Sequence, residues 1–189
     1  MPFLNLADVR PCTQAEGPGK RFAVWCQGCA FRCAGCCNPH MQEFRKKHIV
    51  ATDDLITLIE KSAEKYDLEG VTLLGGEPFL QAEGFAEIAE WCKKHDLSVL
   101  TFTGFLLNDL LAMNDPNVNR VLKNCDILVD GPFIQEQIDS KRDWVGSKNQ
   151  VVHFLSDRYP KGIEYEKNEH FVEILVSENK LLGNGWPFF

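Results

Sequence analysis

The sequence predicts an α/β protein whose strands are mostly parallel. Apolar stretches of strand length alternate along the chain with segments in which apolar residues recur at helical spacing. Strands that alternate with helices in this way are typical of parallel β/α units. The 189 residues, of which 44% are hydrophobic and 25% charged, suit one globular domain with its own core. We therefore expect a single domain over residues 1–189.

The strands are predicted from short apolar runs that end at glycine, proline or polar residues. The run "RFAVW" at 21–25 reads as a buried strand that leads directly into a cysteine-rich loop. The run "VTLLGGEP" at 71–78 is an apolar strand ended by a glycine pair and a proline. Further strands are predicted at 97–104, 126–133, 150–155 and 170–176.

Three helices are predicted between these strands. In the segment 52–66, apolar residues such as Leu55 and Ile59 fall on one face, and acidic residues at its start suit the positive end of a helix dipole. The segment 82–95 repeats the same apolar spacing. A third helix is predicted at 105–113, directly after a strand.

Four loops with distinctive chemistry each follow a predicted strand. They contain the cysteines at 26–37, the turn Gly75–Pro78, the pair Thr103–Gly104 and the segment Asp130–Pro132. In parallel sheets, ligands bind at the carboxyl ends of the strands, where such loops meet. The sequence therefore predicts one active site at this edge of the sheet.

The charge pattern and the lengths of the apolar runs restrict the classes of function. The net charge is −7, yet residues 1–50 carry seven Lys or Arg against three Asp or Glu, a local balance of +4. This basic end is either a site for an anionic ligand or an ordinary solvated surface. The acidic remainder argues against extended nucleic-acid binding. Neither a membrane span nor a signal-peptide layout is visible, so we expect a cytoplasmic protein.

The cysteines are the strongest chemical signal, because thiols in the cytoplasm bind metals or do redox chemistry more often than they form disulfides. The stretch "CQGCAFRCAGCC" (26–37) contains five of the eight. Pairing Cys26 and Cys29 with Cys33 and Cys36 resembles a four-cysteine zinc site, although zinc ribbons separate the pairs by more than three residues. Alternatively, Cys29, Cys33 and Cys36 bind three irons of a [4Fe–4S] cluster and leave the fourth open, and Cys26 is a small buried residue.

The other cysteines have plainer interpretations. Cys12, Cys92 and Cys125 are predicted to be packing residues, since a free cysteine behaves as a small apolar side chain. Cys37 has three interpretations, which are a backbone or packing contact, a spare thiol near the site, and a redox partner of Cys26.

The stretch "GGEP" at 75–78 adds a second signal. A strand that ends in two glycines lets the backbone approach a ligand, and Glu77 can accept a hydrogen bond from a cationic amino group. Alone it is compatible with a plain turn. Together with the spacing Cys29-x3-Cys33-x2-Cys36 it resembles the two signatures of the radical S-adenosylmethionine (SAM) superfamily.

Within that superfamily the sequence is most similar to the small activating enzymes of anaerobic ribonucleotide reductase. The resemblance covers about residues 10–155, and residues 156–189 are expected to form a C-terminal extension. Cys37 stands where this group usually has an aromatic residue, and the tail "GNGWPFF" is outside the pattern. The similar stretches are "EGPGKRFAVWCQGCAFRCAGCCNP" (16–39), "LLGGEPFLQ" (73–81), "LVDGPF" (128–133) and "WVGSKNQ" (144–150).

The resemblance implies an incomplete (β/α) barrel of the radical SAM type with two cofactors, a [4Fe–4S] cluster and S-adenosyl-L-methionine. Cys29, Cys33 and Cys36 would bind the cluster, and the open iron would take the amino and carboxylate groups of SAM. The other residues expected to contact the cofactors surround these cysteines or end the strands. They are Gly35, Cys36, Cys37, Gly75, Gly76, Glu77, Pro78, Thr103, Gly104 and Asp130.

The resemblance also implies the reaction. An electron from the reduced cluster, supplied by a donor such as flavodoxin or ferredoxin, would cleave SAM to methionine and a 5′-deoxyadenosyl radical. That radical would take a hydrogen atom from a backbone glycine of a partner enzyme, expected to be an anaerobic ribonucleotide reductase. Two alternatives stay open, a radical SAM enzyme acting on a small metabolite or peptide and a zinc-stabilised interaction module.

Overall fold

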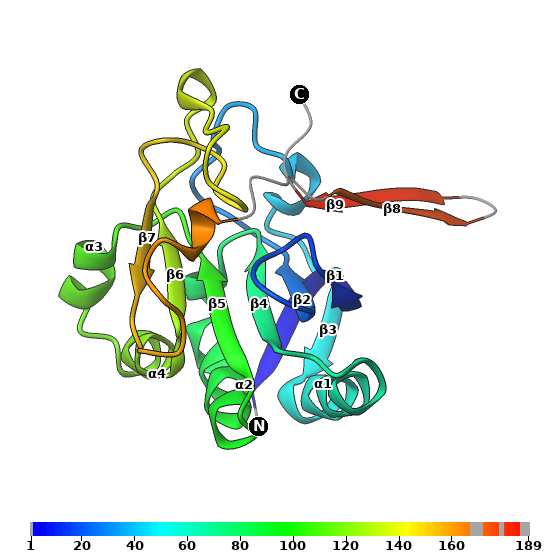
Figure 1. Cartoon of the computed structure of the whole chain (residues 1–189). Coiled ribbons are helices and arrows are strands. Elements are labelled where there is room, and N and C mark those ends of the chain that lie inside the picture. The colour runs from blue at the N-terminus through cyan, green and yellow to red at the C-terminus, as the bar shows by residue number, and fades with distance from the viewer. Residues whose placement is uncertain (1, 167–171, 178–179, 186–189) are drawn as a thin grey trace.

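A seven-stranded sheet forms the centre of the computed structural model, which describes residues 2–166, 172–177 and 180–185 (Figure 1). Its strand order is β3-β1-β2-β4-β5-β6-β7. The strands are β1 (Phe3–Thr13), β2 (Arg21–Cys26), β3 (His48–Ala51), β4 (Gly70–Gly75), β5 (Ser98–Phe102), β6 (Ile127–Asp130) and β7 (Val151–Phe154).

The middle of the sheet is parallel and its flanks are antiparallel. Strands β2, β4, β5 and β6 pair with one another in parallel, as the alternation of strands and helices predicts. On one side β1 and β3 run antiparallel, and on the other β7 runs antiparallel to β6. The strand predicted at 150–155 therefore exists as β7 but reverses direction, because no helix crosses over between β6 and β7.

The described residues contain four α-helices. They are α1 (Thr52–Tyr66), α2 (Ala82–Lys94), α3 (Leu107–Ala112) and α4 (Pro116–Asn124). The first three confirm the helices predicted at 52–66, 82–95 and 105–113. The fourth, α4, was not predicted, although Asp115 caps it by accepting hydrogen bonds from the N–H groups of Asn117 and Val118.

The main core lies between the helices and one face of the sheet. In β2, Phe22, Val24 and Cys26 point to this face and are fully buried. Ala23 and Trp25 point to the opposite face, where they join a smaller apolar cluster. Because side chains alternate along a strand, the helices cover one face and leave the other free to form a site.

Strand β1 was not predicted because its apolar pattern is incomplete. Leu4 and Leu6 are buried in the main core, but the pairing register of β1 shifts between Leu6 and Asp8, so Asp8 and Arg10 face the other side of the sheet. These two polar residues line a cavity on the far face of the sheet. A strand whose residues serve a polar site loses the periodicity by which strands are recognised.

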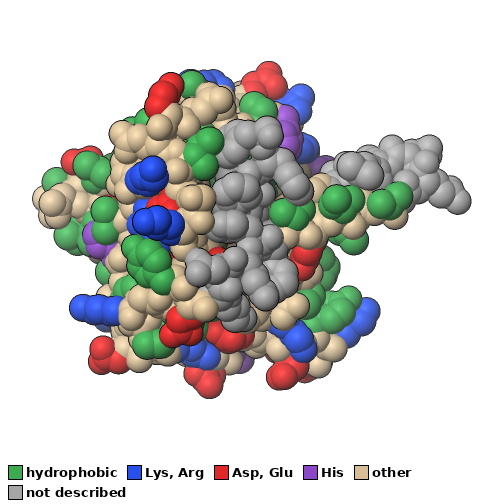
Figure 2. Space-filling view, turned by 45° about the horizontal axis from the view of Figure 1, so that its top comes forward, with side chains coloured by type: hydrophobic (Ala, Val, Ile, Leu, Met, Phe, Trp, Pro, Cys, Tyr) green, Lys and Arg blue, Asp and Glu red, His purple; other side chains and the backbone are tan. Residues whose placement is uncertain are grey.

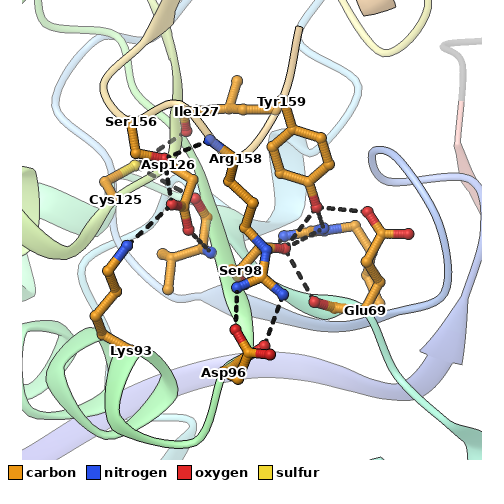
Figure 3. Close-up of polar contacts among 12 residues, drawn as sticks. Glu69, Lys93, Asp96, Ser98, Cys125, Asp126, Ile127, Ser156, Arg158 and Tyr159 are labelled. Atoms are coloured by element: carbon orange, nitrogen blue, oxygen red, sulfur yellow. Dashed lines mark hydrogen bonds and ion pairs between the residues drawn. The ribbon is translucent and has the colours of Figure 1, made fainter.

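The end of the sheet at which the parallel strands begin is closed by polar contacts (Figure 3). The hydroxyl of Tyr159 contacts Ser98 (2.7 Å) and Glu69 (2.5 Å), which lie at the starts of β5 and β4. Ser156 donates to Asp126, just before β6 (2.5 Å). The chain after β7 therefore covers the end of the sheet at which the parallel strands begin. A ligand can then bind only at the opposite end, where the strands have their carboxyl ends.

A separate antiparallel hairpin projects from the body of the molecule (Figure 1). It consists of β8 (Val172–Ser177) and β9 (Lys180–Gly185). Strand β8 confirms most of the strand predicted at 170–176, whose first two residues lie outside the described part of the chain. Strand β9 was not predicted. Within the described residues, no helix has the length and apolar character needed to cross a membrane.

Candidate functional site

A cavity of about 510 Å³ lies at the carboxyl ends of the parallel strands. It is lined by all four loops that the sequence places at this edge, which confirms that they converge. The cysteine loop contributes Cys29, Cys33, Cys36 and Cys37; the loops after β4, β5 and β6 contribute Gly75, Gly76, Glu77, Thr103, Gly104, Gly131, Pro132 and Phe133.

The cysteine loop and the "GGEP" loop are joined through their backbones. The N–H of Gly76 donates to the carbonyl of Cys26 (2.8 Å), and the N–H of Glu77 donates to the carbonyl of Gly28 (2.9 Å). Neither Gly75 nor Gly76 tolerates a side chain. A Cβ on Gly75 would lie 2.6 Å from the Cys26 nitrogen, and a Cβ on Gly76 would lie 2.3 Å from the Gly28 oxygen. The two motifs are far apart in the sequence but are in direct contact in the fold.

We predict that Gly76→Ala separates these loops. The new Cβ would clash with the backbone of Gly28, which cannot rotate away as a side chain could, so the hydrogen bond from Glu77 to Gly28 should break and the protein should lose about 2 kcal/mol of stability. The cysteine loop should also retain less iron after anaerobic reconstitution. Urea unfolding and iron analysis measure the two effects, and a variant with normal stability and full iron would show that this junction is unimportant.

Glu77 fixes the next loop with its buried carboxylate. Its two oxygens accept hydrogen bonds from the Thr103 hydroxyl (2.8 Å), the Gly104 N–H (2.8 Å) and the Phe79 N–H (3.0 Å). Burial raises the pKa of Glu77 to about 7, although these hydrogen bonds oppose the shift. The residue predicted to bind an amino group therefore also ties the end of β4 to the end of β5.

Aromatic contacts attach the cysteine loop to the loop after β5. The ring of Phe31 meets that of Phe105 edge to face, with 4.8 Å between the centroids. Gly104 makes room for Phe31, since a Cβ there would lie 2.5 Å from the ring. On the other side, a backbone hydrogen bond from Phe133 reaches Cys33, so the loop after β6 also touches the cysteine loop.

The five closely spaced cysteines separate into one buried residue and four that line the cavity. The side chain of Cys26 is fully buried in the main core, as its buried interpretation predicts. Among the described residues, the cavity lining includes Cys29, Cys33 and Cys36 but not Cys26. The four-cysteine zinc arrangement therefore lacks one of its ligands at the site.

Cys29, Cys33 and Cys36 fit a cluster better than a single ion. Across the described residues, no three His, Cys, Asp or Glu side chains gather closely enough to hold one metal ion. In a [4Fe–4S] cluster each thiolate binds a different iron, so the sulfurs surround the cluster instead of meeting at a point. Three thiols on one short loop at the edge of a roomy cavity match that requirement.

The thiols differ in how readily they ionise. A hydrogen bond from the Cys37 side chain lowers the pKa of Cys36 to about 6, against the opposing effect of burial, and the N–H of Asn38 also donates to its sulfur (3.4 Å). Burial is the largest influence on the other two and raises the pKa of both Cys29 and Cys33. Cys37 is exposed at the cavity beside Cys36, which is compatible with its interpretation as a spare thiol near the site.

Three residues predicted to contact cofactors are not among the described residues that line the cavity. Gly35 is exposed on the cysteine loop, where a Cβ would lie 2.7 Å from Gln135. Pro78 is buried at the start of a short 3-10 helix. Asp130 accepts hydrogen bonds from the Leu107 N–H (2.7 Å) and contacts His153 Nε2 (2.9 Å), so its carboxylate anchors helix α3. Direct contact of these three with a cofactor stays a prediction.

Several cavity residues were not foreseen from the sequence. Asp8, Arg10 and Glu16 form a polar wall contributed by β1 and the turn after it. Trp25 and Met41 form an apolar part of the lining. Trp25 could have been found as the inward residue of the strand 21–25, but the polar wall depended on recognising β1.

Glu16 is nearly fully buried in this wall, and burial raises the pKa of its carboxyl to about 7. A carboxyl whose pKa is raised on folding lowers the stability progressively as the pH rises from its ordinary value, 4.5, to about 7. We predict that Glu16→Gln removes this dependence. Relative to the variant, the wild type should lose about 3 kcal/mol over that range, measured by urea unfolding at several pH values. Parallel stability curves would contradict the prediction.

The amino-acid sequence of the chain is similar to those of known iron–sulfur proteins. Residues 15–153 match a family described as a 4Fe–4S single cluster domain. Anaerobic ribonucleoside-triphosphate reductase-activating proteins are similar over most of the chain. That of Haemophilus influenzae is 30% identical over 79% of this chain and 97% of its own, and that of Vibrio cholerae is 31% identical with the same coverage. That of Escherichia coli K12 is 30% identical over 80% of this chain and 99% of its own.

Proposed function

Because this chain belongs to the family of anaerobic ribonucleoside-triphosphate reductase-activating proteins and contains a 4Fe–4S single cluster domain, we propose that it is a radical SAM enzyme that generates a glycyl radical on an anaerobic ribonucleotide reductase. The observation that carries the proposal is the shared cavity of Cys29, Cys33 and Cys36 with the "GGEP" loop. An external one-electron donor such as flavodoxin or ferredoxin would complete the system.

The residues present suit both cofactors. Cys29, Cys33 and Cys36 would hold the cluster, and among the described residues the lining also contains a fourth thiol of the same loop, that of Cys37. When bound, the cluster and SAM together supply the 5′-deoxyadenosyl radical that removes a hydrogen atom. The cofactors carry this chemistry, while the protein binds and orients them.

The surrounding residues orient the cofactors and exclude water. The glycines Gly75 and Gly76 expose backbone groups to the cavity without a side chain in between. Glu77 keeps Thr103 and Gly104 at the rim through its hydrogen bonds. The apolar side chains Trp25, Leu74 and Phe102 line the cavity from the sheet and keep it dry around a reactive species.

The proposed function also implies a particular barrel architecture. A sheet covered by helices on one face and hollowed by a cavity on the other is compatible with an incomplete (β/α) barrel of the radical SAM type. The parallel strands β2, β4, β5 and β6 would form its wall. An incomplete barrel suits a protein substrate, because its open side can admit a backbone glycine as part of a larger segment.

The decisive test of the proposed function mixes anaerobically reconstituted protein with SAM, a reductant and an anaerobic ribonucleotide reductase. We expect an electron paramagnetic resonance signal of a glycine-centred radical on the reductase, and no signal when SAM is omitted. SAM cleavage without that signal would instead favour a small metabolite or peptide as substrate. The absence of both SAM cleavage and the radical signal would overturn the radical SAM assignment.

A further inference from the structure

The base of the projecting hairpin lies in the same cavity as the cysteines. Gly183, Asn184 and Gly185, at the end of β9, line the cavity together with Glu16 and Arg10. This short Gly-Asn-Gly segment comes from the C-terminal end of the chain, whereas the residues opposite it come from the first strand and its turn. A segment from the C-terminal part of the chain thus forms part of the wall of the cavity.

Polar contacts attach this segment to the wall. The Gly185 N–H donates to Glu16 Oε1 (2.8 Å). The Asn184 side chain donates from Nδ2 to the Thr13 hydroxyl (2.9 Å) and accepts at Oδ1 from Arg10 Nε (3.4 Å). One residue of β8 adds a further contact, since Glu173 Oε1 accepts from the Gln14 N–H (2.9 Å). All four contacts reach residues 10–16.

The described side chains of the hairpin are attached to the body by polar contacts. Among the described residues, the apolar clusters of the core include none from β8 or β9. Instead Ile174, Leu175 and Val176 are 57%, 49% and 77% exposed, and Figure 2 shows hydrophobic side chains along the projecting part of the hairpin. Polar contacts at the edge of a cavity can be exchanged for contacts with water or with a partner, whereas a buried apolar interface cannot.

The chemistry of the segment matches that of the proposed substrate. Gly185 has a φ of +111°, a backbone conformation that glycine adopts readily and other residues rarely do. The proposed reaction acts on a backbone glycine of another protein, which must bring a similarly small segment to the same cavity. A substrate segment that approaches the cavity from this side would have to displace Gly183–Gly185 from the wall.

We propose that Gly183–Gly185 is an intramolecular occupant of the substrate entrance, and that the reductase must detach the hairpin base from residues 10–16 before its glycine can reach the cavity. This inference rests on the proposed function. The hairpin is then an autoinhibitory strap, which keeps the mouth closed to other molecules until a partner that competes for this position arrives.

Asn184→Ala tests the strap because it removes the contacts to Thr13 and Arg10 while leaving the cysteine loop intact. Asn119→Ala, on the exposed side of α4, is the matched control. We expect the reductase concentration that gives half-maximal radical formation to fall about three- to tenfold in Asn184→Ala, the effect of one or two weak hydrogen bonds. The maximal rate should stay unchanged, and the control should behave as the wild type.

Hydrogen exchange gives a readout that does not depend on turnover. In the wild type, the Gly185 amide should exchange faster once saturating reductase is added, because Glu16 no longer accepts its hydrogen bond. Slower or unchanged exchange at Gly185, or an unchanged or higher half-maximal concentration in Asn184→Ala, would overturn the strap while the wild type still forms the radical. If the wild type forms no radical on the reductase, the proposed function fails and the strap fails with it.

Discussion

Cys33→Ala should abolish both cluster assembly and SAM cleavage. Cys33 lies between Cys29 and Cys36 on the same short loop, so its loss leaves two of the three predicted ligands. Two thiolates from one flexible loop cannot hold three irons of a [4Fe–4S] cluster. Iron and sulfide analysis after anaerobic reconstitution, together with the yield of 5′-deoxyadenosine, measures the loss, which we expect to be complete within the detection limit.

Cys125→Ala is the matched control for this experiment. Cys125 is buried in the main core, where its thiol contacts the carbonyl of Ile127 (3.0 Å), and burial raises its pKa to about 12. Its replacement should cost about 1 kcal/mol of stability and leave iron content and cleavage normal. Equal loss of iron in Cys33→Ala and Cys125→Ala would show that the ligands are wrongly assigned, provided that both variants remain folded.

Glu77→Ala should have the largest effect on stability of any single change at the site. The substitution leaves the Thr103 hydroxyl and the N–H groups of Gly104 and Phe79 without their buried acceptor. Each unsatisfied buried donor costs about 1 kcal/mol or more, so we expect a loss of about 3 kcal/mol in the free energy of unfolding. The loop after β5 should also move away from the cavity and weaken SAM binding at least tenfold.

Two further variants make this prediction specific. Glu77→Gln retains an oxygen for Thr103 and Phe79 but turns an amide toward the Gly104 N–H, so its loss of stability should be intermediate. Glu83→Ala, on the exposed start of α2, should change neither stability nor SAM affinity. Urea unfolding and equilibrium binding of SAM give the two quantities. A Glu77→Ala protein as stable as Glu83→Ala would mean that the carboxylate does not join the loops.

Local signals in the sequence predicted the elements that form the scaffold of the site. The apolar spacing of residues 52–66 gives α1 with the same bounds, because its buried face is complete through Leu55 and Ile59. The cysteine loop and the "GGEP" loop were placed at one edge by the rule that parallel strands end together. Their backbone contact confirms that placement.

The features that the sequence did not yield depend on residues far apart in the chain. Strand β1 places Asp8 and Arg10 in the cavity, so its alternation of apolar residues is interrupted. The direction of β7 depends on which edge of the sheet the chain returns to, which no local pattern records. Asn184 meets Thr13 only after the whole sheet is built. Helix α4 is different, since Asp115 and Pro116 are a recognisable helix start that was missed.

The most direct test of the central claim is to analyse anaerobically reconstituted protein for metal and sulfide and then to reduce it in the presence of SAM. The account predicts about four irons and four sulfides per chain, and formation of 5′-deoxyadenosine and methionine in equal amounts. Protein that holds one zinc and no iron, or iron-loaded protein that leaves SAM intact after reduction, would contradict it.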